Sequence, residues 1–366
     1  MITFKQFLLL EGGNVTIDGT EAERIDLTKH DRAGITRKIW AALAAVNAAF
    51  RKQHKKPIWS DALLKSRKFL SGSAFHFFSD SISDSTFVKH KKSVGDIDTQ
   101  VDKTMEAELE SFLTASKGQT FGPVTLVGFK KSAGQLITLW HLADPGINIQ
   151  IDLEMVDFDE HGNPTEWSNF SHSSAWEDME KGIKGVAHKY LLRALDAPKL
   201  KDVVLKAKTA RGKDKEVKSS ETAFSVTHGV RQKLKPVLDD NGKQVLVNGK
   251  PAYHELSTDE SKGDTSLKNI FKAYFDRTPT ASELRKMGSF SGLLELIKAH
   301  FDSKDQKKIA DGFARTLWGP AAQGLYRGDP DKDREEKIAM MRILLKELNQ
   351  NDTYEAERNE FYARYK

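Results

Sequence analysis

Cysteine is absent from all 366 residues of the chain. Its absence excludes disulfide bridges, thiolate metal sites and a cysteine nucleophile, and it fits a reducing compartment. A long hydrophobic run is absent as well. The N-terminal run Phe7–Leu10 is shorter than the hydrophobic region of a secretory signal, and Glu11 follows it directly. We therefore expect a soluble, cytoplasmic protein without a membrane partner.

A strong excess of one charge is also missing. The chain has 57 Lys and Arg against 52 Asp and Glu, which leaves a formal net charge of +5. A balance of this size permits a polyanionic partner without requiring one. Hydrophobic residues make up 39% and charged residues 30% of the chain, which suits a packed core under a solvated surface. The length allows two domains, or one large domain with an appendage.

The first half of the chain mixes helical and strand-like patterns. Apolar residues at helical spacing, from Ile39 to Phe50, predict a helix over residues 35–53. Alternating apolar and polar residues predict strands over residues 94–101 and 147–156. A hairpin is predicted from the strands over residues 124–129 and 135–142. We therefore expect an α+β core over residues 36–195.

The second half begins with a basic region and ends in helical patterns. Residues 181–218 contain 12 Lys and Arg against 4 Asp and Glu, a local excess of +8. Asn241-Gly242 and Asn248-Gly249 are typical of hairpin turns between short strands. The sequence therefore predicts a basic connector with β-hairpins over residues 196–260, followed by a helical C-terminal domain over residues 265–366.

Three aspartates carry the clearest chemical pattern. Asp96 and Asp98 are two residues apart on a predicted strand, so their side chains leave the same face of a sheet. Two such carboxylates repel each other and favour a bound cation, and Mg²⁺ prefers oxygen ligands of this kind. Asp152 lies on the polar face of the strand over residues 147–156, and Glu154 on that face is the alternative third ligand. If the two strands are neighbours, three carboxylates converge into a set suited to two metal ions.

A small-residue turn precedes these aspartates. Gly72-Ser73 follows the apolar pair Phe69-Leu70 at a predicted strand-to-helix turn. Such a turn offers backbone N–H groups and a hydroxyl to an anion, which suits the phosphates of a nucleoside triphosphate.

The order of Leu70, Gly72-Ser73, Asp96-Ile97-Asp98 and Asp152 resembles the DNA polymerase β-type nucleotidyltransferase superfamily. That group includes poly(A) polymerases, CCA-adding enzymes and antibiotic nucleotidyltransferases. The resemblance covers residues 36–195, roughly half of the chain. It implies an α+β fold with a mixed sheet flanked by helices. It also implies Mg²⁺-dependent transfer of a nucleoside monophosphate from an NTP to a hydroxyl, with release of pyrophosphate; Mn²⁺ is a possible substitute.

The resemblance also implies roles for individual residues. Asp96 and Asp98 would bind the metal ions, and Asp152 would complete the metal site and orient or deprotonate the acceptor hydroxyl. Gly72 and Ser73 would hold the β- and γ-phosphates. The basic connector favours an RNA or DNA 3′ end as the acceptor.

Two features depart from the family pattern. Ser71 stands between Leu70 and Gly72, and the spacer before Asp96 is lengthened by an insert over residues 80–92. The run Lys89-His90-Lys91-Lys92 in this insert either reaches a phosphate or is part of a solvated loop.

A predicted helix at the end of the 36–195 region supplies further candidates for nucleotide binding. Lys184 and His188 are four residues apart, on one helical face, and Lys189 follows. We consider Lys184, His188 and Lys189 as contacts to the triphosphate or the acceptor; an ordinary surface helix is the alternative. His188 lacks a second histidine at the spacing of a zinc site, so zinc is not expected.

Two other functions fit parts of the pattern. One is a non-catalytic phage head or nucleic-acid-binding protein on the same fold. The other is a glycosyltransferase that uses Asp96 and Asp98 to hold the metal of a sugar nucleotide. That class needs a nucleotide-binding α/β unit upstream, and residues 1–60 do not supply one.

The N-terminal segment Met1–Glu11 resembles the capsid-targeting leaders of internal head proteins in large tailed bacteriophages. These leaders are short and amphipathic, and a prohead protease cuts them after a Leu-x-Glu tripeptide, here Leu9–Glu11. The same pattern occurs at Leu293–Glu295 and Leu345–Glu347, both in predicted helices, so only its position distinguishes Leu9–Glu11. The resemblance implies cleavage after Glu11 and packaging in a phage head; a plain amphipathic first helix is the alternative.

Overall fold

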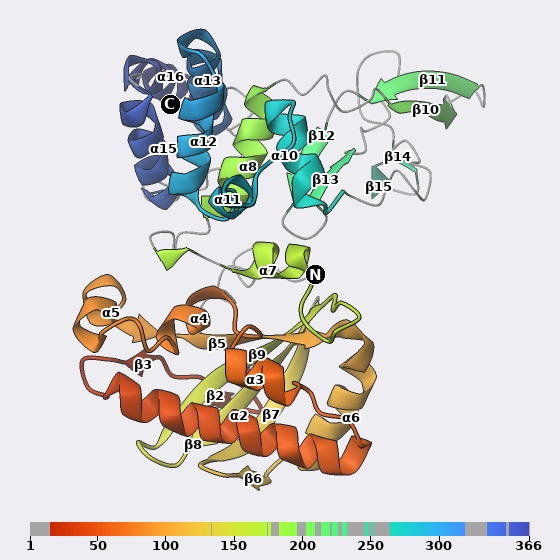
Figure 1. Ribbon diagram of the computed structural model, residues 1–366, viewed down its shortest axis with the longest axis vertical. Helices are drawn as coiled ribbons and strands as arrows, with labels where there is room; N and C mark the ends of the chain where they lie inside the picture. The colour runs from red at the N-terminus through yellow and green to blue at the C-terminus, as the bar shows by residue number, and fades with distance from the viewer. Residues whose placement is uncertain are drawn as a thin grey trace. The chain divides into compact units, whose positions relative to one another are not determined.

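The chain forms two compact units, residues 1–176 and 177–366 (Figure 1), and each is considered by itself. The computed structural model describes residues 15–132, 134–173, 175–176, 183–195, 203–208, 214–219, 222–225, 229–232, 246–247, 250–251, 264–318, 335–348 and 351–365. The predicted leader, residues 1–11, lies outside the described residues.

A five-stranded mixed sheet forms the centre of the first unit. Its strands, in spatial order, are β5 (Asp96–Asp102), β9 (Ile147–Val156), β8 (Gln135–Leu142), β7 (Val124–Ser132) and β6 (Thr120–Phe121). The pair β5 and β9 is parallel, and all other neighbours are antiparallel. The α+β class and the mixed sheet flanked by helices, both expected from the sequence, are therefore confirmed.

Two helices cover one face of this sheet (Figure 1): α2 (Arg32–His54) and α6 (Glu106–Ser116). The side chain of Asp31 caps α2 by accepting a hydrogen bond from Gly34 N, which satisfies a backbone donor of the first turn. The helices and the sheet enclose an apolar core lined by residues such as Val46, Phe112, Trp140 and Leu153. Burying a side chain of this size stabilises the fold by about 1.5–3 kcal/mol.

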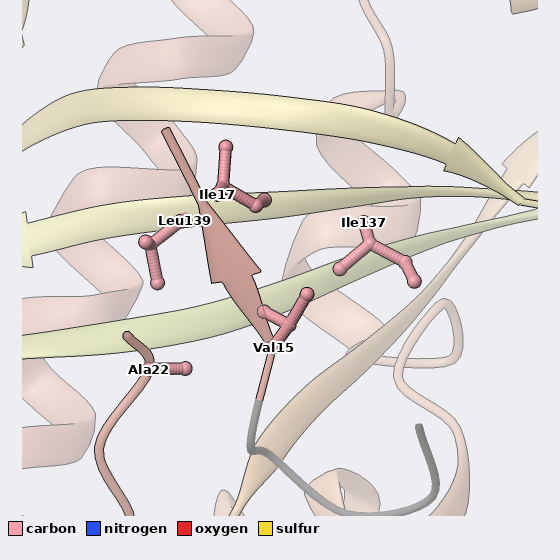
Figure 2. Packing of buried hydrophobic residues seen from close by; sticks show 5 residues of the cluster. All are labelled: Val15, Ile17, Ala22, Ile137 and Leu139. Atoms are coloured by element: carbon pink, nitrogen blue, oxygen red, sulfur yellow. The ribbon is translucent and has the colours of Figure 1, made fainter. Parts of the chain in front are cut away.

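A short hairpin covers part of the opposite face. It consists of β1 (Thr16–Ile17) and β2 (Thr20–Glu21). Figure 2 shows how its apolar residues meet β8 in one cluster, formed by Val15, Ile17, Ala22, Ile137 and Leu139. Gly128 of β7 leaves room for the hairpin, because a Cβ there would lie 2.9 Å from Ile17 Cγ2. The sequence patterns did not indicate this hairpin.

The first unit has further described elements outside the five-stranded sheet and its two covering helices. They are β3 (Ile25–Asp26), which pairs with β4 (Ser93–Val94), the 3-10 turn η1 (Lys103–Met105), and the helices α3 (Asp61–Ser66), α4 (Gly72–Phe77), α5 (Asp84–His90) and α7 (Glu166–His172). The pairing of β3 with β4 brings the N-terminal part of the chain beside the start of β5.

The first described element of the second unit is α8 (Ile183–Ala194), which packs against α13 (Ser303–Trp318) and β12 (Thr222–Ser225). The described hairpins pair β12 with β13 (Gly229–Gln232), β10 with β11 (Val203–Lys208, Asp214–Ser219), and β14 with β15 (Leu246–Val247, Lys250–Pro251). Hairpins are thus present in the predicted connector, and β14 and β15 flank Asn248-Gly249. The turn Asn241-Gly242 lies outside the described residues. The structure groups α8 with the second unit, whereas the sequence assigned it to the core.

The helical C-terminal region contains α10 (Leu267–Phe275), α11 (Ala281–Lys286), α12 (Phe290–His300), α13, α15 (Glu335–Glu347) and α16 (Asn351–Tyr365). Leu293–Glu295 lies inside α12 and Leu345–Glu347 inside α15, as the sequence patterns predicted. Within the part of the chain that the structure describes, no helix has both the length and the apolar character required to cross a membrane.

Candidate metal centre

The parallel register of β5 and β9 brings the three aspartates together. Asp98 lies opposite Asp152, and Asp96 lies opposite Gln150. Because side chains alternate along a strand, all four project from the same face of the sheet. Oxygen atoms of Asp96, Asp98 and Asp152 lie within 4.8 Å of one another. This separation is compatible with ligands that share a small, hard cation.

Apolar side chains lie next to the three aspartates on the same face of the sheet. Asp152 lies opposite Ile137 of β8, and Ile137 in turn lies opposite Lys130 of β7. Ile137 belongs to the cluster that the N-terminal hairpin covers, and Asp152 itself is buried, with 5% of its surface exposed. The carboxylate therefore stands at the boundary between an apolar patch and a polar site.

Burial and mutual repulsion disfavour the charged form of all three aspartates. Burial, and next the charge of the Asp96 carboxylate, raise the pKa of Asp152 to about 7. The pKa of Asp98 lies well above its ordinary value, first because of burial and then because of the charge on Asp96. Burial also raises the pKa of Asp96. Clustered carboxylates of this kind gain most from a cation that neutralises them.

Gln150 is hydrogen-bonded to one member of the group. Its Nε2 donates to both carboxylate oxygens of Asp152, at 3.0 Å each. Its Oε1 is buried and accepts no hydrogen bond from the described part of the chain. An amide oxygen without a partner beside three carboxylates fits the ligand set of Mg²⁺. The sequence analysis missed Gln150, although the alternation of β9 placed it on the same face as Asp152.

Glu154 has a different role from Asp152. It lies opposite Gln100, which comes two residues after Asp98 on β5. Its Oε2 accepts a hydrogen bond from Ser71 Oγ at 2.6 Å and lies 3.0 Å from His172 Nδ1. The geometry therefore favours Asp152 as the third ligand, and Glu154 holds the turn before α4.

The turn with Gly72 and Ser73 lies directly beside Asp98. Residues 69–71 run along the edge of β5, where Ser71 N donates to Asp98 O at 3.1 Å and Gln100 N donates to Phe69 O at 2.6 Å. Gly72 then begins α4 with a positive φ of 52°. The structure thus brings Gly72 beside Asp98, and Ser73 follows it in the first turn of α4.

Three basic residues act electrostatically on the carboxylates. The charges of Lys91 and Arg24 favour the ionised form of Asp96 and so oppose the rise in its pKa. Lys130 acts on Asp152 in the same way, while burial lowers the pKa of Lys130 itself. Arg24 and Lys130 were missed by the sequence analysis, because only the pairing of strands brings them to the site.

The other nucleotide-binding candidates belong to the second unit. His188 is fully buried in α8 and stacks on Phe224. Its ring nitrogens lie 2.8 Å from Met287 O and 3.2 Å from Tyr274 Oη. Burial lowers the pKa of His188 to about 4. This environment gives His188 a packing role within its own unit and argues against direct contact with a nucleotide.

The two lysines near His188 differ in exposure. Lys184 is buried and Lys189 is exposed. Their contacts with a triphosphate or an acceptor stay predictions.

Comparison of the chain with protein-family models, curated proteins and solved structures finds no match in any of the three.

Proposed function

We propose that the protein is a Mg²⁺-dependent nucleotidyltransferase, which transfers a nucleoside monophosphate from an NTP to a hydroxyl and releases pyrophosphate. The observation that carries the proposal is the convergence of Asp96, Asp98 and Asp152 beside Gly72. The parallel pair β5 and β9, flanked by helices, supports a nucleotidyltransferase-like fold as part of the same proposal.

The reaction assigns a task to each part of the site. Asp96, Asp98 and Asp152 hold the metal, and Gly72 N–H and the Ser73 hydroxyl bind the β- and γ-phosphates. A bound Mg²⁺ would polarise the phosphoryl oxygens and the acceptor hydroxyl. The acceptor oxygen bonds to the α-phosphorus, the bond from this phosphorus to the bridging oxygen breaks, and pyrophosphate leaves with the electron pair. Asp152 orients the hydroxyl and takes its proton.

A nucleic-acid 3′ end is the acceptor that the composition favours. Residues 181–218 carry a local excess of +8, and clustered Lys and Arg bind phosphate backbones. By the resemblance of its leader, the protein would be cut after Glu11 by a prohead protease and packaged in a phage head, to act in the host cytoplasm. Mass spectrometry of the protein from purified particles would show an N-terminus at Gly12.

Transfer of labelled NTPs tests the activity. The full chain is incubated with each α-labelled NTP, Mg²⁺ or Mn²⁺, and pools of RNA or DNA. We expect label transfer by the natural chain and its loss in the double variant Asp96→Asn plus Asp98→Asn. Asp102→Asn is the matched control: it lies on the same strand and face but outside the three-carboxylate group.

The outcomes separate the candidate functions. Transfer that persists in the double variant would contradict the proposed site. A protein that transfers nothing but binds nucleic acid, with salt-sensitive affinity unchanged in the variant, would be a non-catalytic component. Preferential binding of a sugar nucleotide with Mn²⁺ would favour a glycosyltransferase.

A further inference from the structure

Gln150 on β9 carries a buried amide oxygen that has no hydrogen-bond partner. Only 2% of the residue is exposed. Its Nε2 donates to both carboxylate oxygens of Asp152, at 3.0 Å each, whereas its Oε1 accepts no hydrogen bond from the described part of the chain. A buried oxygen that stays unpaired costs free energy, so this atom indicates a ligand such as an ion or a water molecule.

The contacts of Nε2 fix the region in which Oε1 lies. The two atoms are bonded to the same carbon, which keeps them within about 2.6 Å of each other. Oε1 therefore lies within about 5.6 Å of both Asp152 oxygens. Asp152 belongs to the group whose oxygen atoms, one each from Asp96, Asp98 and Asp152, lie within 4.8 Å of one another. Gln150 also lies directly opposite Asp96 in the parallel register, so its unpaired oxygen lies at the three-aspartate group.

The chemistry around Oε1 favours a cation. No donor among the described residues reaches this oxygen, and the nearest members of the group, Asp152 and Asp96, carry carboxylates. Ionised carboxylates accept hydrogen bonds and donate none, so they repel a further unpaired oxygen. A divalent cation satisfies the amide oxygen and the carboxylates together. Carboxylate and carbonyl oxygens are the donor set that suits Mg²⁺ and Mn²⁺.

We propose that Gln150 Oε1 is a fourth protein ligand of the cation held by Asp96, Asp98 and Asp152. This inference rests on the function proposed above and adds a neutral ligand that the family resemblance does not assign. Nε2 of the same amide holds the Asp152 carboxylate, so one side chain orients one ligand and supplies another. A neutral ligand also adds an oxygen without a further negative charge in a group that already holds three carboxylates.

A spectroscopic test detects the contact between Gln150 and the metal. Mn²⁺ is bound to the full chain, in which glutamine is isotopically labelled at the side-chain carbonyl carbon, and electron–nuclear double resonance measures the coupling of this nucleus to the metal. We expect a strong coupling in the natural chain and its loss in Gln150→Met. A natural chain that binds Mn²⁺ without this coupling would show that Oε1 holds only water, which would overturn the proposal.

Gln100 provides the matched control. It is a second buried glutamine with an unpaired Oε1, on the same face of the sheet, but it lies opposite Glu154 instead of Asp96. Gln100→Met should therefore retain the coupling. Loss of the coupling in Gln100→Met, with its retention in Gln150→Met, would assign the ligand to the wrong glutamine and overturn the proposal.

Calorimetric titration with Mn²⁺ measures how much the contact contributes to binding. We expect Gln150→Met to bind Mn²⁺ about 10- to 100-fold more weakly, and Gln100→Met to bind it like the natural chain. Equal weakening in both variants would indicate general damage to this buried face, and unchanged affinity in Gln150→Met would show that Oε1 is no ligand; either result overturns the proposal. If Gln150→Met does not fold, Gln150→Asn withdraws the amide by one methylene and is compared with Gln100→Asn.

The results also distinguish this inference from the proposed function. If the natural chain transfers nucleotides but Gln150→Met binds Mn²⁺ as tightly as Gln100→Met, the inference is wrong and the function stands. If Gln150 contributes to Mn²⁺ binding but the natural chain transfers no nucleotide, the metal ligand stands and the proposed reaction fails. If the natural chain binds no Mn²⁺, both are overturned.

Discussion

Gly72 and Asp98 approach so closely that a Cβ on Gly72 would lie 2.5 Å from Asp98 Oδ2. Gly72 also has a φ of 52°, in the left-handed region that favours glycine. Any larger residue at this position would push the carboxylate aside and strain the backbone. Close packing and backbone conformation therefore both require glycine where the turn before α4 meets Asp98.

The first prediction concerns this contact. We expect Gly72→Ala to weaken Mn²⁺ binding at least about tenfold, because the new Cβ must displace the Asp98 carboxylate and the positive φ strains the backbone by about 1–3 kcal/mol. Calorimetry with Mn²⁺ measures the change. Gly118→Ala is the control, because Gly118 has a φ of 78° but a Cβ there meets no described atom within 4 Å. Equal Mn²⁺ affinity in both variants would show that the close approach is unimportant.

The second prediction concerns pH and metal removal. Asp152 has a pKa of about 7 in the folded protein and 3.8 as its ordinary value. The folded state therefore holds this proton more tightly, and the metal-free protein loses stability as the pH rises from about 4 to 7. The loss from this group is at most about 4 kcal/mol.

Thermal melts at about pH 5 and pH 8 check this dependence. Mn²⁺ should raise Tm more at the higher pH, where the carboxylates are ionised. Asp152→Asn should raise the metal-free Tm at that pH and remove most of the response to Mn²⁺, whereas Asp102→Asn should behave like the natural chain. A metal response that is the same at both pH values would contradict the argument.

The third prediction concerns His188 in the second unit. Its pKa is about 4 in the folded protein and 6.5 ordinarily, so the unfolded chain takes up the proton first as the pH falls. Stability should therefore fall by about 2 kcal/mol between pH 7 and pH 5. Urea unfolding at the two pH values measures this loss. His188→Gln should remove it, and His161→Gln, which changes an exposed side chain, should not.

The fourth prediction concerns the N-terminal hairpin. Ile17 is 5% exposed and packs with Ile137 and Leu139. Ile17→Ala should lower the free energy of unfolding by about 2–4 kcal/mol, since it leaves a cavity in this cluster. Removal of residues 1–11 should leave this stability unchanged, because the proposed cleavage after Glu11 keeps every described residue of the cluster in the chain. Urea unfolding compares the two variants, and a large loss on removal of the leader would contradict the boundary.

The sequence predicted those features of the candidate site that depend only on residues close together along one strand. Alternation along the strand indicated that Asp96 and Asp98 share one face, and that Gln150, Asp152 and Glu154 share another. It did not decide between Asp152 and Glu154, since both satisfy the alternation. That choice follows from the register of β5 against β9, which pairs Asp98 with Asp152.

The sequence by itself determined the residue types and the faces that they occupy, because helical and strand periodicity are properties of neighbouring residues. Only the tertiary structure decided that the charges of Arg24, Lys91 and Lys130 act on the aspartates and that His188 is buried. These contacts join segments far apart in the chain, and their geometry depends on strand register and on the packing of the insert around Arg32.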